Sequence, residues 1–345
     1  MAPFRPPWHA GDVRVAFERL SREFLEKMIT APTVFIVGAG ANVHLGFPVG
    51  KVLLQKTCDL LTERSESGIG DPKALYTLRC VRPTVRDIEQ FRHDLAASFS
   101  PSVDAFLELR PEFSDLGKAA MASVLLPSEA DSDHLVRDPS TPSWLKYVFH
   151  RMRTDADSFC DNQVSFVTFN YDRSLEHLLC RALKGTYGMA DAQAANLVAT
   201  IPIVHPHGQL GRLPWQDPDG HVPGPSVPYG AKPGDQVLTQ CVESIRIIHE
   251  ADRDLGEMQR AQQLLQQASR IYFLGFGYHN DNVARLNPGH WRRATHVAGT
   301  AYNMETQERI TVQRTFAACG VEQEVELGGS KMDCLDWLRE YAGLS

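Results

Sequence analysis

The sequence lacks the features that mark membrane-spanning, secreted and nucleic-acid-coated proteins. No apolar run approaches about 18 residues, the length that a membrane-spanning helix needs, so we expect no such helix. The N-terminus has no charged segment followed by an apolar core, so we expect no secretory signal. The net charge of -7 argues against a nucleic-acid surface over the whole protein, although it leaves room for a local basic patch. These absences favour a soluble, cytoplasmic protein.

Paired cysteines are absent as well. The seven cysteines are widely spaced, and no two of them form a CxxC pair. We therefore predict reduced thiols that pack as small apolar side chains, rather than a disulfide framework. Because structural zinc sites rich in cysteine use such pairs, we expect no zinc site of this kind.

Short apolar runs rich in β-branched residues alternate with amphipathic stretches, and this alternation indicates the fold class. Strands are predicted over residues 33–37, 164–168, 199–204, 271–274 and 295–298, and helices over 12–29, 251–269 and 331–341. The alternation predicts an α/β fold, with a Rossmann-like, mainly parallel sheet and helices on both faces. We expect one domain over 31–345, preceded by an N-terminal helix in 1–30 that is a candidate assembly element.

Between the first two predicted strands, residues 51–157 are predicted to be mostly helical and to form an insertion or cap. Turn-forming residues are predicted to interrupt this insertion at 65–72, Pro83, Pro101 and 127–143. Further along the chain, residues 214–235 contain six prolines and four glycines, which predicts a loop.

Glycines follow the first predicted strand, in Gly38-Ala39-Gly40-Ala41-Asn42 and then Gly46-Phe47-Pro48. Glycines in this position let backbone N–H groups approach a pyrophosphate, and a helix N-terminus that follows favours its negative charge. The pattern is not a complete GxGxxG, because Val43 occupies the last glycine position. A tight strand-to-helix turn without a ligand is the alternative explanation.

Polar residues follow two other predicted strands, in Thr168-Phe169-Asn170-Tyr171-Asp172 and in His205-Pro206-His207-Gly208. Asp172 suits the role of a helix N-cap, whereas Asn170, two residues earlier, fits that role less well. A histidine at a strand end is a good general base, and one of the two histidines is a candidate for it. An HxH pair also ligates metals, although no further cysteine or carboxylate cluster stands nearby.

A fourth segment, Gly275-Phe276-Gly277-Tyr278-His279-Asn280-Asp281-Asn282, again places glycines after a buried strand. A loop with a helix N-cap is the alternative explanation here. In a doubly wound sheet, ligands bind beyond the carboxyl ends of the strands, which is where all four segments lie. The sequence therefore predicts that the four segments form one site.

The order of these motifs resembles the sirtuin superfamily over roughly residues 30–305. Gly38–Asn42 and Gly46–Pro48 are similar to the family's GAG-x-S and SGxP segments, and Thr168–Asp172 is similar to T-Q-N-I-D. The family's catalytic histidine precedes a glycine, as His207 precedes Gly208, and a later glycine-containing strand end is matched by Leu274–Gly277.

The departures from the family pattern point to one branch of it. The zinc module of protein deacylases, with its two CxxC pairs, is absent, and Pro48 is followed by Val49-Gly50-Lys51 in place of D-F-R. Asn42 stands where a serine is usual. Together with Ser102-Val103-Asp104-Ala105-Phe106-Leu107, close to S-I-D-x-F-L, these features look more like the sirtuin-like NAD hydrolases of bacterial anti-phage defence.

This resemblance implies an enzyme that cleaves the nicotinamide–ribose bond of NAD and depletes NAD when triggered. It implies that Asn170 orients water and ribose hydroxyls, and that His207 contacts a ribose hydroxyl or acts as general base. The implied NAD-binding residues are Gly38, Ala39, Gly40, Asn42, Pro48, Asp172, Gly275 and Gly277. NAD is then the substrate, and no zinc or other cofactor is expected.

Such an activity would be toxic to its own cell unless it were controlled. The resemblance therefore implies a homo-oligomer controlled by a co-encoded regulatory protein, such as a ring-forming ATPase of the HerA type or another nucleic-acid sensor. Helices in 1–29 and 51–157 are candidates for these contacts. Three alternatives stay open at this point: a deacylase without zinc, a non-catalytic NAD or ADP-ribose sensor, and a metal-dependent hydrolase built on His205 and His207.

Overall fold

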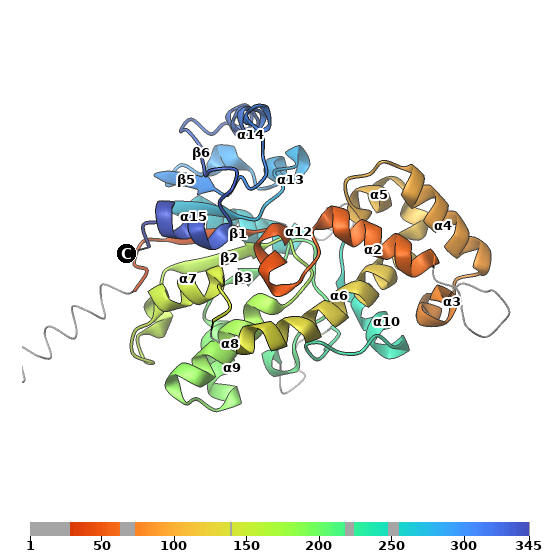
Figure 1. Cartoon of the computed structure of the whole chain (residues 1–345). Helices are drawn as coiled ribbons and strands as arrows, with labels where there is room; N and C mark the ends of the chain where they lie inside the picture. Colours follow the sequence, from red (N-terminus) through yellow and green to blue (C-terminus); the bar gives the residue numbers. More distant parts are fainter. Residues whose placement is uncertain (1–27, 63–72, 139, 218–223, 248–254, 345) are drawn as a thin grey trace, which may run out of the picture.

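The computed structural model describes residues 28–62, 73–138, 140–217, 224–247 and 255–344. Six strands form one sheet: β1 (Thr33–Val37), β2 (Val164–Thr168), β3 (Ile203–Val204), β4 (Arg270–Leu274), β5 (His296–Gly299) and β6 (Glu326–Leu327). All neighbouring pairs are parallel, in the order β3-β2-β1-β4-β5-β6 (Figure 1). This is the strand order of a doubly wound Rossmann sheet, so the predicted fold class is confirmed.

Helices connect these strands and cover both faces of the sheet. They are α2 (Gly50–Thr62), α3 (Ala74–Thr77), α4 (Val85–Ala97), α5 (Val103–Leu109), α6 (Ser114–Arg137), α7 (Trp144–Met152), α8 (Ser174–Tyr187), α9 (Asp191–Ala199), α10 (Asp235–Ser244), α12 (Leu255–Gln267), α13 (Asn280–Arg285), α14 (Thr306–Ala318) and α15 (Cys334–Tyr341). No helix in the described ranges is long and apolar enough to cross a membrane.

Alternate residues of the strands point to two separate hydrophobic cores. Phe35 of β1 packs with residues of α7, α8 and α15 on one face, where its ring stacks on Phe166 with 5.5 Å between centroids. Val34 and Ile36 point to the other face and pack with residues of α12, α13 and α14. Since the strands are apolar on both faces, they read as continuous apolar runs in the sequence.

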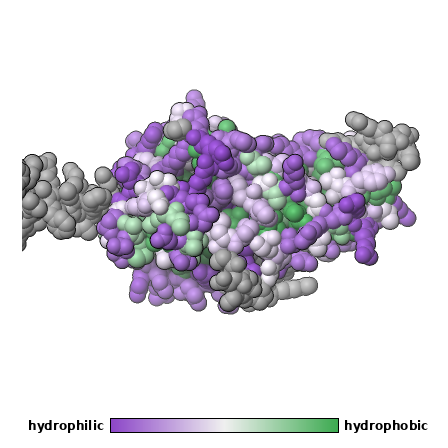
Figure 2. Space-filling model, turned by 90° about the horizontal axis from the view of Figure 1, so that it is seen from below, coloured by the Kyte–Doolittle hydropathy of each residue, from purple (hydrophilic) through white to green (hydrophobic). Residues whose placement is uncertain are grey.

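The predicted helical insertion is confirmed, since α2 to α7 lie between β1 and β2. Figure 1 shows α2 to α6 extending to one side of the sheet, with α10 beside α6. The predicted N-terminal helix over 12–29 falls almost entirely outside the described residues, as do the turn at 65–72 and part of the loop at 214–235. The face in Figure 2 is mostly hydrophilic, and its apolar residues form small separate groups.

Two predicted boundaries are wrong. The turn expected at 127–143 begins only after Arg137, because α6 continues through Pro127. Buried contacts beyond this proline favour the helix, since Glu129 pairs with Arg173 and the Ser132 hydroxyl lies 2.6 Å from the Tyr229 hydroxyl. The strand expected at 199–204 is also shorter, because α9 extends to Ala199 and β3 contains only two residues.

The Glu129–Arg173 pair joins the insertion to the loop after β3. Both side chains are fully buried. Arg173 donates to both carboxylate oxygens of Glu129 and to the carbonyl oxygens of Gly211, Val227 and Pro228, while Glu129 also accepts from the backbone N–H of Gly230. These bonds fix the loop on α6 and α8, and we refer to them below as the Glu129 clamp.

Candidate functional site

The loops after β1 and β4 meet where the strand order reverses, which is where ligands bind in doubly wound sheets. The two backbones touch there. The N–H of Gly40 donates to the carbonyl of Gly275 over 3.0 Å. A Cβ on Gly38 would lie 2.6 Å from that carbonyl oxygen, and a Cβ on Gly275 would lie 1.9 Å from the nitrogen of Ala41. Gly275 also has a φ of +57°, which favours glycine.

These contacts change the interpretation of the glycines. The N–H groups of Gly38 and Gly40 donate to Leu274 and Gly275 carbonyls, and that of Gly275 donates to the Thr300 hydroxyl. They are therefore engaged by the protein rather than facing a pyrophosphate as predicted. The glycines allow the two loops to approach each other closely. Gly277, in contrast, is exposed and stays a candidate for ligand contact.

Asn42 and Asp172 form a buried network beneath the first loop. The Asn42 amide donates to both carboxylate oxygens of Asp172, over 3.0 and 3.2 Å, and to the hydroxyl of Ser174 over 2.9 Å. Asp172 also accepts from the Ser174 N–H over 3.1 Å, although it is not the predicted N-cap, because α8 begins after Arg173, which makes no side-chain cap bond. Burial raises the pKa of Asp172. Both residues thus hold the β1 and β2 loops together.

The remaining members of the first motif are also inside the fold. The 3-10 helix η1 (Ala39–Leu45) is held from the insertion by Trp144, whose indole N–H donates to the Ala41 carbonyl over 2.9 Å. Pro48 is buried in the segment that leads into α2. The first motif therefore forms a packed turn between β1 and the insertion.

Asn170 lies at the carboxyl end of β2, beside the glycine turn. Its side chain is 7% exposed, and its amide nitrogen donates to the Gly38 carbonyl over 3.3 Å. Its backbone carbonyl accepts from Nδ1 of His205 over 3.1 Å. The side-chain amide of Asn170 is therefore held against β1, and its backbone is held against the histidine loop. Asn170 stays a candidate for a residue that orients a ligand.

His205 is committed to the protein through both ring nitrogens. Its Nε2 lies 2.7 Å from Oε1 of Glu176, a buried residue in the first turn of α8. Burial opposes charge on the imidazole, but the Glu176 carboxylate outweighs burial and raises the pKa of His205. Burial alone would raise the pKa of Glu176, but the neighbouring His205 lowers the pKa of this carboxyl. This ion pair makes His205 a positioning residue for the Asn170 backbone.

His207 has a different environment, although it is equally buried. Its Nε2 has no hydrogen-bond partner among the described residues. The ring packs edge-to-face on Phe169, the neighbour of Asn170, with 5.2 Å between centroids. Burial, and secondarily the positive charge of Arg285, lower the pKa of His207 to about 4. The imidazole is thus neutral near pH 7 and keeps a polar nitrogen for another group.

Helix α13 carries Asn282 and Arg285, and the positive charge of Arg285 acts on His207. Arg285 lies 3.8 Å from Glu108 of α5, so it connects α13 to the insertion. Oδ1 of Asn282 is buried and has no partner in the described part of the chain. Buried polar atoms normally have partners, so the free nitrogen of His207 and the free oxygen of Asn282 are each candidates for contact with a polar ligand.

The S-x-D-x-F-L segment connects the insertion to this site. Ser102 caps α5 by accepting from the N–H of Ala105, and the half-buried Asp104 accepts a hydrogen bond from the hydroxyl of Tyr171. Tyr171 stands between Asn170 and Asp172 in the chain. The segment thus positions the loop after β2.

The structure therefore brings the four predicted segments to one edge of the sheet, where the ring of Phe169 contacts that of His207. Sequence patterns did not single out Glu176, Arg285 or Glu108. Each is a charged residue within a helical stretch, where charged residues are common and normally face solvent. No group of three or more potential metal ligands occurs in the described ranges. A scan against models of known protein families finds no match to this chain, and a search of curated proteins finds none either.

Proposed function

We propose that the protein is an NAD hydrolase that cleaves the bond between nicotinamide and ribose. The main support is the buried, unpartnered Nε2 of His207 on the carboxyl edge of a Rossmann-ordered sheet, with the His207 ring packed on Phe169, the chain neighbour of Asn170. Ligands bind at this edge in doubly wound folds. The order of the sequence motifs, which resembles that of sirtuin-like NAD hydrolases, supplies the choice of NAD as substrate.

The reaction needs positioning more than acid–base chemistry. Nicotinamide leaves NAD as a neutral molecule, while positive charge develops on the ribose, so the site must hold the ribose and a water molecule in place. Asn170 would orient the water and the ribose hydroxyls. A His207 pKa of about 4 lies well below neutral pH, which favours hydrogen bonding to a ribose hydroxyl over general-base catalysis.

Other residues would support this arrangement from the protein side. The ion pair of His205 with Glu176 would fix the backbone of Asn170, and the glycine contacts would fix the loops of β1 and β4. Asp172 and Asn42 would maintain the turn rather than contact NAD directly, since their polar atoms bond to each other.

The resemblance extends the proposal to biology. We propose that the protein is an effector of bacterial antiviral defence, active as a homo-oligomer and controlled by a co-encoded regulator. The exposed insertion helices are candidates for the contacts with either partner. This part of the proposal has its own test, which is the mass of the protein in solution with and without the neighbouring gene product.

The activity is tested by incubating the purified chain with NAD and measuring nicotinamide and ADP-ribose by mass spectrometry. Asn170→Ala and His207→Ala should each reduce nicotinamide release at least about 100-fold, as expected for loss of a main positioning group. The matched control is His290→Ala, since His290 is exposed, lies outside the insertion and bonds to its neighbour Asn287. NAD binding is measured by calorimetry in parallel. A chain that neither binds nor cleaves NAD, with and without its co-encoded partner, would contradict the proposal.

A further inference from the structure

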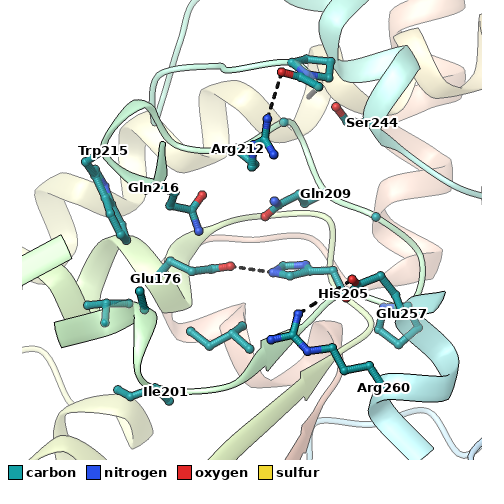
Figure 3. A pocket seen from close by; sticks show the side chains of 18 of the residues that line it. Glu176, Ile201, His205, Gln209, Arg212, Trp215, Gln216, Ser244, Glu257 and Arg260 are labelled. Carbon is teal, nitrogen blue, oxygen red and sulfur yellow. Dashed lines mark hydrogen bonds and ion pairs between the residues drawn. The ribbon is translucent and has the colours of Figure 1, made fainter. Parts of the chain in front are cut away.

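A second cleft lies at the outer edge of the sheet, beyond β3. It has a volume of about 620 Å³ and is bounded by α9, the loop after β3, the end of α10 and the start of α12 (Figure 3). This is large enough for a small organic ligand, since such sites typically measure about 300 to 1,000 Å³. The cleft does not include Asn170 or His207.

The floor of the cleft carries hydrogen-bond acceptors that the protein leaves unused. Figure 3 shows the Glu176–His205 ion pair at its centre. Oε1 of Glu176 contacts His205, but Oε2 is buried without a partner among the described residues, and so is Oε1 of Gln209. The side chain of Glu176 is only 3% exposed. A ligand that satisfies this floor must donate hydrogen bonds, as amino groups do.

The walls of the cleft favour a flat ring. The indole of Trp215 is half-buried and flanks the opening in Figure 3, next to Gln216. Apolar side chains of Ala195, Val198 and Ile201 line the adjacent wall. Stacking on an aromatic side chain is a common way to hold a nucleobase, because every base has a π-face.

The rim of the cleft is rich in arginine. Arg212, Arg246 and Arg260 line it together with two carboxylates, those of Glu243 and Glu257. Arg260 is more than half exposed and lies 3.9 Å from Glu257. Arg212 lies 3.9 Å from Asp217 as well, so the three guanidinium groups face three carboxylates, and Arg246 is the one arginine of the three for which no side-chain ion pair is shown in the described ranges. The planar N–H groups of these arginines suit the oxygens of a phosphate on the ligand.

We propose that this cleft binds a purine nucleoside monophosphate. Its amino group donates to Glu176 and Gln209, its base lies against Trp215, and its phosphate lies among the arginines of the rim. The proposal does not rest on the proposed function, because neither Asn170 nor His207 lines the cleft. The histidine loop is common to both places, since His205, Pro206 and Gly208 line the cleft and His205 also holds the backbone of Asn170.

Calorimetry of the full chain tests the proposal with AMP, GMP, UMP and inorganic phosphate. AMP or GMP should bind at least about tenfold more tightly than UMP, which has no amino group, and than phosphate, which has no base. Equal binding of UMP, or no binding of either purine nucleotide at millimolar concentration, would overturn the proposal.

Four variants locate the binding. Trp215→Leu should weaken purine nucleotide binding about tenfold, whereas Tyr76→Leu, at a half-exposed aromatic of α3, should leave it unchanged. His207→Ala should also leave it unchanged, which separates this cleft from the NAD site. If Trp215→Leu does not fold, Gln209→Leu removes the acceptor instead and should abolish the preference over UMP. Binding that is lost in His207→Ala but retained in Trp215→Leu would refute the assignment to this cleft.

Discussion

The Glu129 clamp should contribute strongly to stability, and Glu129→Gln tests this. The substitution preserves the shape of the side chain but removes the negative charge opposite Arg173, which stays fully buried. Its new NH₂ group also replaces an oxygen that accepts from Arg173 or from the N–H of Gly230. Removing one partner of a buried ion pair typically destabilises a protein by about 3 to 5 kcal/mol.

Urea unfolding at pH 7.5 measures the effect. With a urea m-value of about 3 kcal/mol/M, the loss lowers the midpoint by about 1 to 1.7 M. The matched control is Asp133→Asn, one turn further along α6, where the half-buried carboxylate contacts Arg137, His177 and Arg181. Ion pairs nearer the surface contribute less than buried ones, about 0 to 1 kcal/mol when exposed, so this variant should lose clearly less stability than Glu129→Gln.

A second measurement, protease cleavage of the loop after β3, completes this experiment. Because Arg173 donates to carbonyls of Gly211, Val227 and Pro228, the Glu129→Gln variant should be cleaved faster by protease within this loop. Equal midpoints for Glu129→Gln and Asp133→Asn would refute the reasoning, because burial would then make no difference to how much an ion pair contributes to the free energy of unfolding.

Two further predictions concern the candidate site. Gly275→Ala combines a positive φ with a Cβ 1.9 Å from the Ala41 nitrogen, so it should destabilise by about 2 to 4 kcal/mol in urea unfolding. Gly188→Ala, with a similar φ but open space, should lose only about 1 kcal/mol, and an equal loss in both would exclude the loop contact as the cause. Because the pKa of His207 falls from 6.5 to about 4 on folding, its contribution is complete above pH 6.5 and is lost as the pH falls toward 4. Between pH 7.5 and 5, wild type should lose about 2 kcal/mol more stability than His207→Gln, and parallel losses would contradict a buried neutral imidazole.

The sequence was sufficient where a local signal defines the element. The bounds of β1 and β2 match the apolar runs 33–37 and 164–168, because strands buried on both faces read as short uninterrupted apolar segments. Around the edge strand β3 the apolar run predicted a strand but not its bounds, since β3 is only two residues long and follows Pro202. At Pro127 a local helix-breaking signal was outweighed by the contacts of Glu129, which depend on the tertiary fold.

The candidate site was predictable at the level of segments but not of contacts. Strand ends of a parallel sheet share one edge, so the positions of Asn170 and His207 followed from the order of elements. The packing of Gly38 and Gly40 on Gly275 did not follow, because those residues are far apart in the chain and no local pattern reports their contact. The His205–Glu176 pair could not be predicted from a local pattern either. Because Glu176 binds His205, it is His207 that keeps a ring nitrogen without a partner among the described residues.

The position of β1 in the middle of the sheet has a consequence for biosynthesis. Thr33 pairs with Val164 on one side and Arg270 on the other, so this strand emerges from the ribosome about 130 and 240 residues before its neighbours. At roughly 5 to 20 residues per second, the second neighbour follows after about 12 to 50 seconds. During that interval the four consecutive apolar residues Val34–Val37 can pair at most on one side, with β2, which makes the nascent chain a natural client for chaperones.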